Sequence, residues 1–191
     1  MRIVLASGSP RRKELLEMVG IKNLTVIPDT SEEKMTLGLA PEETVCEIAL
    51  NKAKNVSSLC DKNDIIIAAD TLVYLDNEAI SKPVNKADAV EILRRLSGRR
   101  HTVYTGIALL KGNEHVTQAE QTDVFFRELT DDEIFAYVET GEPMDKAGAY
   151  GAQGIASIFV KRIEGDFFNV MGLPLCSLSI MLKNFCNMSI M

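Results

Sequence analysis

Short apolar runs alternate with amphipathic stretches along the chain, and this pattern predicts a mixed α/β fold. Runs of strand length occupy residues 2–6, 24–28, 65–69, 72–75, 101–110, 115–126 and 158–163. Helical periodicity, with N-cap or C-cap signals, predicts helices over residues 11–19, 41–58, 86–97, 131–139 and 175–185. The polar residues 111–114 between two strand patterns are typical of a hairpin turn.

The apolar run at residues 65–69 stands out because it leads directly into Asp70. Three isoleucines and two alanines favour a strand that is covered on both faces. In open α/β sheets the carboxyl ends of strands face the ligand, so an acid there is a candidate base or metal ligand. The alternative is a turn-forming Asp before the next strand at residues 72–75.

Residues 7–13 read Ser-Gly-Ser-Pro-Arg-Arg-Lys and follow the first predicted strand. Ser9 is the expected N-cap of the next helix, and Pro10 its first residue. The basic residues 11–13 then oppose the positive end of the helix dipole, which calls for a compensating anion. We therefore predict a phosphate-binding cradle, which is not a Walker loop because that pattern is absent. A capped helix with solvated arginines is the alternative.

Two lysines are candidate phosphate ligands. Lys52 lies on the apolar stripe of the helix predicted at 41–58, seven residues after Val45, which directs its ammonium inward or toward the edge of a cleft. A lysine that extends along apolar surface to reach water is the alternative. Lys82 precedes Pro83, which favours an extended backbone and a defined direction, although such a residue is also ordinary in a loop.

Six of the twelve glycines fall within residues 141–172. Glycine allows backbone to approach a ligand and also permits tight turns. A flexible linker is the alternative, but linkers seldom carry specific polar and aromatic groups such as Asp145, Tyr150 and Gln153. The segment is therefore predicted to contribute to a site.

Length and composition indicate one globular domain or two tightly joined lobes. The chain has 191 residues, of which 46% are hydrophobic and 25% are charged. No segment approaches the roughly 20 apolar residues that span a bilayer, so we expect a cytoplasmic protein without a membrane partner. The net charge of −6 disfavours nucleic-acid binding, because phosphate backbones are bound by excess Lys and Arg.

The metal-ligating residue types restrict any metal site. Only two histidines are present, His101 and His115, and the four cysteines form no C-x-x-C pair. A multi-histidine, zinc or disulfide framework is therefore not expected, whereas a hard, oxygen-bound cation such as Mg²⁺ or Mn²⁺ would fit. His101 is expected to be structural, since a single histidine in a strand has no evident partner.

Six motifs occur in order from residue 7 to residue 174. They read Ser7-Gly8-Ser9-Pro10-Arg11-Arg12, Ala69-Asp70-Thr71, Lys82-Pro83, Leu96-Ser97-Gly98, Asp145-Lys146-Ala147-Gly148-Ala149-Tyr150-Gly151-Ala152-Gln153-Gly154 and Asn169-Val170-Met171-Gly172-Leu173-Pro174. In these motifs the chain closely resembles the Maf family. Ala68 and Ala152 depart from the family pattern, and both affect packing more than chemistry.

The resemblance implies an elongated mixed β-sheet flanked by helices, with two lobes around a cleft, similar to the inosine triphosphatase fold. It implies a nucleoside triphosphate pyrophosphatase that requires a divalent metal, Mg²⁺ or Mn²⁺. Asp70 is similar to the family's general base. Glu33 and Asp70 together are similar to the carboxylates of the family that bind the metal.

The same resemblance implies substrate contacts. Ser9, Arg12, Lys52 and Lys82 match phosphate ligands of the family. The combination of Arg12, Thr71 and Gln153 resembles the branch that hydrolyses dTTP and UTP rather than the branch acting on 7-methyl-GTP. The expected partner is thus a small-molecule triphosphate, and a homodimer is left open. A non-catalytic nucleotide-binding regulator of septum formation is the alternative function.

Overall fold

The computed structural model describes residues 2–31 and 38–190, which form two compact units. Unit 1 comprises Met1–Asp70, Thr105–Glu120 and Gly172–Met191, and unit 2 comprises Thr71–Tyr104 and Gln121–Met171. The chain thus crosses between the units several times. The assignment of residues 1–191 to a single domain stays a prediction.

The described residues form a seven-stranded sheet in the order β2-β1-β3-β5-β6-β7, with β4 paired to β3. The strands are β1 (Ile3–Leu5), β2 (Leu24–Val26), β3 (Ile65–Leu75), β4 (Glu78–Ile80), β5 (Arg100–Lys111), β6 (Glu114–Phe126) and β7 (Val160–Glu164). The β1 strand is parallel to both β2 and β3, whereas β3–β4 and β6–β7 are antiparallel. The predicted mixed sheet is therefore confirmed.

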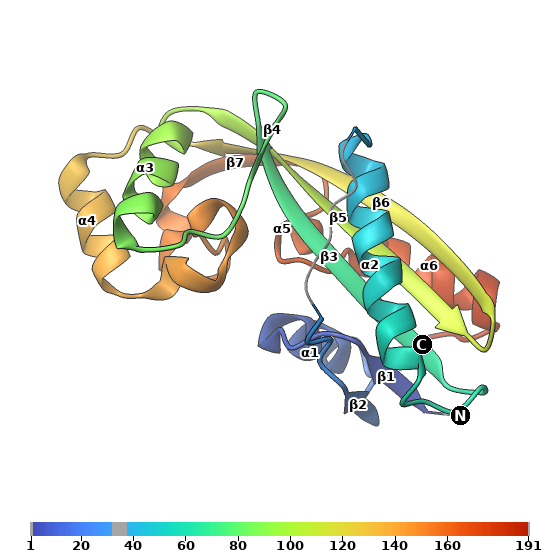
Figure 1. The fold of residues 1–191 in the computed structure, drawn as a ribbon. Coiled ribbons are helices and arrows are strands. Elements are labelled where there is room, and N and C mark those ends of the chain that lie inside the picture. The colour runs from blue at the N-terminus through green and yellow to red at the C-terminus, as the bar shows by residue number, and fades with distance from the viewer. Residues whose placement is uncertain (1, 32–37, 191) are drawn as a thin grey trace. The chain divides into compact units, whose positions relative to one another are not determined.

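Unit 1 contains the helices α1 (Pro10–Met18), α2 (Pro41–Ser57) and α6 (Leu175–Cys186). Figure 1 shows α2 lying along the strands of this unit. The predicted apolar stripe of α2 is buried, and Ala49, Ala53 and Val56 pack with sheet residues such as Ile66. A Cβ built on Gly106 of β5 would lie 2.3 Å from the carbonyl carbon of Val45, so this helix and the strand approach backbone to backbone.

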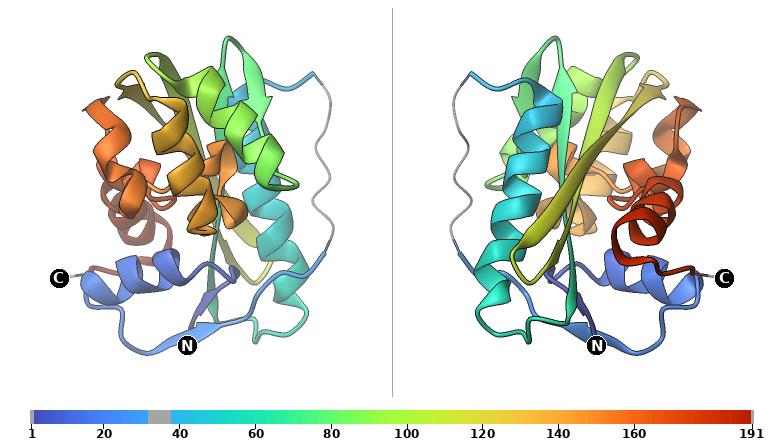
Figure 2. Two further views of the ribbon diagram at one scale, coloured as in Figure 1. Left: turned by 90° about the vertical axis from the view of Figure 1, so that its left-hand side faces the viewer. Right: turned by 90° about the vertical axis from the view of Figure 1, so that its right-hand side faces the viewer.

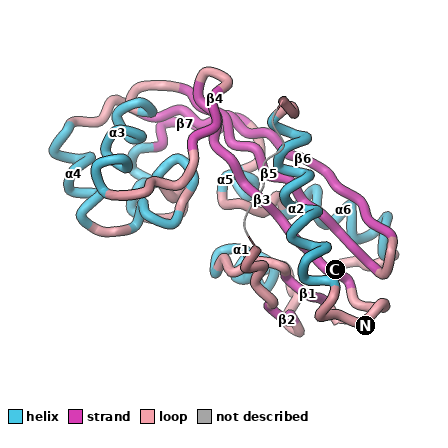
Figure 3. Tube along the Cα trace, in the orientation of Figure 1, coloured by secondary structure: helices cyan, strands magenta, loops and turns pink. Residues whose placement is uncertain are grey.

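Unit 2 contains α3 (Lys86–Leu96), α4 (Asp131–Glu139), α5 (Phe167–Val170) and three short 3₁₀ helices, η1 (Glu142–Asp145), η2 (Ala147–Ala149) and η3 (Ile155–Phe159). The α3 and α4 helices pack side by side (Figure 2). Short loops connect α4 to η1, and η1, η2 and η3 to one another (Figure 3). The core of this unit includes Leu93, Ile134 and Phe159.

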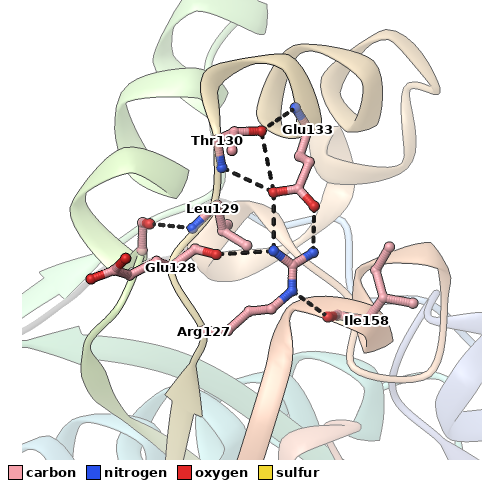
Figure 4. A network of polar contacts seen from close by, with 7 residues as sticks. Arg127, Glu128, Leu129, Thr130, Glu133 and Ile158 are labelled. Atoms are coloured by element: carbon pink, nitrogen blue, oxygen red, sulfur yellow. Dashed lines mark hydrogen bonds and ion pairs between the residues drawn. The ribbon is translucent and has the colours of Figure 1, made fainter.

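The start of α4 is held by a polar network (Figure 4). Thr130 and Glu133 form the predicted capping box, in which Thr130 Oγ1 accepts from the Glu133 N–H. The Glu133 carboxylate accepts two hydrogen bonds from the Arg127 guanidinium, at 2.6 and 3.0 Å. Arg127 Nε also donates to the Ile158 carbonyl, so the end of β6, α4 and η3 are joined.

The main correction concerns the strand that contains Asp70. The sequence predicted that a strand ends at Asp70 and a second begins at residue 72, but β3 runs without a break for 11 residues. Its neighbour β1 ends opposite Ile67, while β4, which was not predicted, pairs with Val73 to Leu75. Backbone pairing on the far side of Asp70 therefore continues the strand.

The other predicted elements are present, with ends that shift by one or two residues. The strand expected at 158–163 begins later, at Val160, because Ile155–Phe159 form a 3₁₀ helix. Within residues 2–31 and 38–190, no helix combines the length and apolar character that a membrane span requires.

Candidate functional site

Asp70 and Lys52 form a buried ion pair in unit 1. Lys52 extends from α2, and its Nζ lies 2.6 Å from Asp70 Oδ1. The two side chains are only 14% and 7% exposed, so the pair is shielded from bulk water. The alternative in which Lys52 reaches out to water is therefore wrong, and the inward direction predicted from its stripe is confirmed.

The second carboxylate oxygen of Asp70 faces a different environment. Asp70 Oδ2 is buried, and no described residue donates a hydrogen bond to it. A buried carboxylate oxygen without a donor is costly, and such exceptions in native proteins often mark a functional role. Oδ2 of Asp70 is therefore able to accept a hydrogen bond from a water molecule or to bind a cation, while Oδ1 is bound by Lys52.

The predicted phosphate cradle is organised around Ser7 and Arg12. Arg12 Nη1 donates to Ser7 Oγ at 3.1 Å, and Arg12 Nε donates to the Gly172 carbonyl at 2.8 Å. The Ser9 N–H also donates to Ser7 Oγ, at 3.3 Å. Ser9 occupies the N-cap position as predicted, but its hydroxyl makes no capping bond among the described residues. The arginine is thus fixed at the start of α1 by two neighbouring segments.

Sheet register brings this cradle near Asp70. Leu5 is paired with Ile67, and the Ala6 N–H donates to the Ile67 carbonyl at 2.8 Å. The loop that carries Ser7 therefore leaves the sheet beside the part of β3 that leads to Asp70. Because neighbouring strands lie about 4.8 Å apart, the loop that leaves the end of β1 lies beside the stretch of β3 that continues through Asp70.

Asp29 is a further charged residue of unit 1 that sequence reasoning did not single out. It follows β2, and its carboxylate accepts hydrogen bonds from Ser31 N, Ser31 Oγ and Asn55 Nδ2. Although burial acts to raise it, these bonds and the nearby charge of Lys52 lower the pKa of Asp29 below its ordinary value. An Asp just after a predicted strand was the available signal.

The remaining predicted substrate residues belong to unit 2. Thr71 is half-buried in β3, and Lys82 is exposed after β4. The Gly148 N–H donates to the Ser81 carbonyl at 3.3 Å, so the Lys82 segment contacts the glycine-rich segment. Gln153 is exposed within that segment.

Of the two carboxylates predicted to bind a metal, Asp70 lies in the described part of the chain. Asp70 supplies a buried carboxylate oxygen, which suits a hard cation such as Mg²⁺ or Mn²⁺. Glu33, the second predicted carboxylate, lies outside the described residues. Within the described part of the chain, no group of three or more His, Cys, Asp or Glu side chains is arranged to hold a metal.

His101 is buried in unit 2, as its predicted structural role requires. Its Nε2 lies 2.8 Å from the Tyr150 hydroxyl in a hydrogen bond, and the ring also packs edge-on against Phe126. Burial lowers the pKa of His101 to about 4, against a weak opposing effect of Asp123. Its partner was not evident along the chain because Tyr150 lies 49 positions away in the sequence.

Comparison with known proteins agrees with the motif pattern. The family model described as Maf-like protein matches residues 2–185. The chain is 47% identical over 184 residues to a dTTP/UTP pyrophosphatase of Bacillus anthracis (strain CDC 684 / NRRL 3495), with 96% of this chain and 95% of the relative covered. It is 46% identical over 184 residues to a dTTP/UTP pyrophosphatase of Bacillus cereus (strain AH820), with the same coverage.

Among solved structures, the chain is similar to a HAM1 protein from Coxiella burnetii. The TM-score is 0.56 at 17% identity, and the match covers 96% of this chain and 99% of that one. This similarity concerns the fold, and it confirms the fold class that the resemblance implied. With the family model spanning nearly its whole length, the chain belongs to the Maf family.

Proposed function

We propose that this chain hydrolyses dTTP and UTP to the nucleoside monophosphate and pyrophosphate. Relatives that are 46–47% identical over 96% of the chain are named dTTP/UTP pyrophosphatases, which supports a nucleotide pyrophosphatase. The observation that carries the proposal is the buried Asp70–Lys52 pair, in which one carboxylate oxygen is held and the other has no donor among the described residues.

Asp70 is proposed to act as the general base. A water held at Oδ2 would lose a proton to the carboxylate as it attacks the α-phosphorus, and the bond from the α-phosphorus to the bridging oxygen would break. Lys52, bound to Oδ1, keeps the carboxylate in one orientation during this step. A positioned base of this kind contributes about 10²- to 10⁴-fold to the rate.

Phosphate binding is assigned to Ser9, Arg12, Lys52 and Lys82. Triphosphate cleavage depends mainly on positioning and on neutralising charge, which cations and a helix N-terminus provide. Arg12 is pre-organised for this work, since Ser7 and Gly172 already fix its guanidinium. If several phosphates are bound at once, pyrophosphate is the natural leaving group.

A divalent cation is proposed as cofactor, with Asp70 and Glu33 as the residues that would hold it. The buried Oδ2 of Asp70 fits an oxygen-preferring ion. When bound, Mg²⁺ or Mn²⁺ supplies positive charge to the phosphates.

Base selection is assigned to Gln153, with Thr71 as a second substrate contact. An amide both donates and accepts hydrogen bonds, which suits the carbonyl and N–H edge of thymine or uracil. We further propose that the substrate is a free nucleotide in the cytoplasm rather than nucleic acid, in line with the net charge of −6.

Turnover in ¹⁸O-labelled water tests the proposed reaction. The purified chain is incubated with dTTP, UTP, CTP, GTP and ATP in the presence of Mg²⁺ or Mn²⁺, and the products are analysed by mass spectrometry. We expect dTTP and UTP to react fastest, with label in the monophosphate and none in pyrophosphate. Label in orthophosphate, released with a diphosphate, would contradict attack at the α-phosphorus. Tight binding without turnover would instead support the non-catalytic regulator.

A further inference from the structure

The turn that carries Gln153 is tight and exposed. The Gly154 N–H donates to the Gly151 carbonyl at 3.0 Å, which places Ala152 and Gln153 at the two central positions of a turn. The Gln153 side chain is exposed, so surrounding core packing does not fix its direction. Its orientation depends instead on whatever holds the two ends of the turn.

Two hydrogen-bonded side chains lie against this turn. The Tyr137 hydroxyl donates a hydrogen bond to Glu142 Oε1 at 3.1 Å. Glu142 Oε2 accepts from the Ile155 N–H at 3.0 Å. The hydrogen bonds therefore run from Tyr137 through Glu142 to Ile155, and the Glu142 carboxylate lies close to both Gly151 and Gly154, on either side of Gln153. We call Tyr137 and Glu142 the turn clamp.

Packing and charge keep the turn clamp in place. The Tyr137 side chain is buried, and its ring packs edge-on against Phe159 at 5.2 Å between centroids. Burial, helped by the charge of Glu142, raises the pKa of Tyr137, so its hydroxyl stays protonated and able to donate. Hydrogen bonds to a carboxylate are stronger than those between neutral groups, which adds rigidity.

The glycines of the turn fit the turn clamp sterically. A Cβ at position 154 would lie 2.2 Å from Glu142 Oε1, so only glycine lets the carboxylate contact the backbone there. A Cβ at position 151 would lie 2.9 Å from Cε of Lys146, whose ammonium donates to the Glu142 carbonyl. The spacing of Gly151 and Gly154 thus follows from close contacts with Lys146 and Glu142.

We propose that Tyr137 and Glu142 are positioning residues for base selection, because they hold the turn that presents Gln153. The inference rests on the proposed function and deepens it. Pre-organising a recognition group lowers the cost of ordering it when the substrate binds. A loose turn would weaken contacts to the preferred base but would leave phosphate chemistry intact.

Selectivity measurements test the turn clamp. Tyr137→Phe removes the hydroxyl but keeps the ring against Phe159, and Glu142→Gln keeps the size of the side chain without its charge. Glu139→Gln is the matched control, since Glu139 lies on the surface of α4, where its exposed carboxylate pairs with Lys86. The readouts are kcat and KM for dTTP and CTP, and hydrogen exchange of the Gly154 and Ile155 amides.

We expect both clamp variants to lower the ratio of kcat/KM for dTTP over CTP about fivefold, on the scale of one lost hydrogen bond. KM for dTTP should rise while kcat changes less than twofold, and the two amides should exchange faster. Gln153→Ala should lower the same ratio, and adding Tyr137→Phe to it should have less than a twofold further effect, because the two act through one contact.

The outcomes separate this inference from the proposed function. If Gln153→Ala lowers the ratio but the clamp variants do not, the turn clamp is overturned and the proposed function stands. If Tyr137→Phe lowers the ratio by its full amount even when Gln153→Ala is present, the turn clamp is also overturned. Such a result would mean that Tyr137 does not act through Gln153. An unchanged ratio in Gln153→Ala overturns both base selection and the clamp. Absence of dTTP and UTP turnover in the wild type overturns the proposed function itself.

Discussion

Asp70 in unit 1 and Gln153 in unit 2 are positioned by different physical means. Asp70 lies within a buried strand, and the register of β1 and β3 together with the helix that carries Lys52 determines where its carboxylate lies. Gln153 lies on an exposed turn that depends on a few side-chain hydrogen bonds. The comparison indicates that core packing positions Asp70, whereas local polar contacts position the turn that carries Gln153.

The largest expected effect concerns the buried carboxylate. Asp70→Asn should reduce kcat by about 10²- to 10⁴-fold, because an amide cannot accept the proton from water, while affinity for the triphosphate stays within several-fold. Single-turnover kinetics and equilibrium binding measure the two quantities. Asp76→Asn is the matched control, since Asp76 lies in an exposed turn and pairs with Arg99. A near wild-type rate in Asp70→Asn would remove this residue from the mechanism.

A smaller loss is expected from the cradle. Arg12→Ala should lower kcat/KM about ten- to hundredfold through both KM and kcat, because the guanidinium neutralises phosphate charge in the ground and transition states alike. Arg95→Ala removes the same charge from an ion pair with Glu78 on the surface of unit 2 and should have little effect. Equal losses in both variants would mean that overall charge matters, not the position of Arg12.

The close approach between α2 and β5 provides a test of the packing that positions Lys52. Gly106→Ala would insert a methyl group 2.3 Å from Val45 backbone atoms, so α2 must move. We expect a loss of about 1–3 kcal/mol in the free energy of unfolding and reduced activity well below the melting temperature. For stability, Gly8→Ala is the control, since its nearest contact would be 3.6 Å. An unchanged melting temperature in Gly106→Ala would contradict this tight packing.

The smallest expected effect is a pH dependence of stability from His101. Its folded pKa of about 4 lies below the ordinary value, so the unfolded chain binds the proton first as the pH falls. The stabilising contribution is present above about pH 6.5 and is lost progressively toward about pH 4. Urea unfolding from pH 7.5 to 4.5 should therefore show a weaker pH dependence for His101→Gln. Parallel curves for both proteins would show that His101 does not titrate on unfolding.

The sequence by itself determined most of the local structure of this protein. Apolar periodicity located the buried stripe of α2, the capping box at Thr130 located the start of α4, and the polar residues at 111–114 located the hairpin. These features depend on residues close together in the chain, where spacing and capping chemistry act directly. The motif at residues 69–71 led to the prediction that Asp70 is a site residue, and the apolar stripe of α2 led to the same prediction for Lys52.

Only the tertiary structure decided which of these residues meet. Pairing with β4 carries β3 through Asp70, and the packing of α2 gives Asp70 its partner Lys52. Likewise, His101 finds Tyr150 across 49 positions of sequence. The turn clamp joins the end of α4 to a glycine turn through contacts that no local pattern indicates. The physical reason is that hydrogen bonding and burial depend on neighbours in space, whereas spacing along a chain reports only neighbours in sequence.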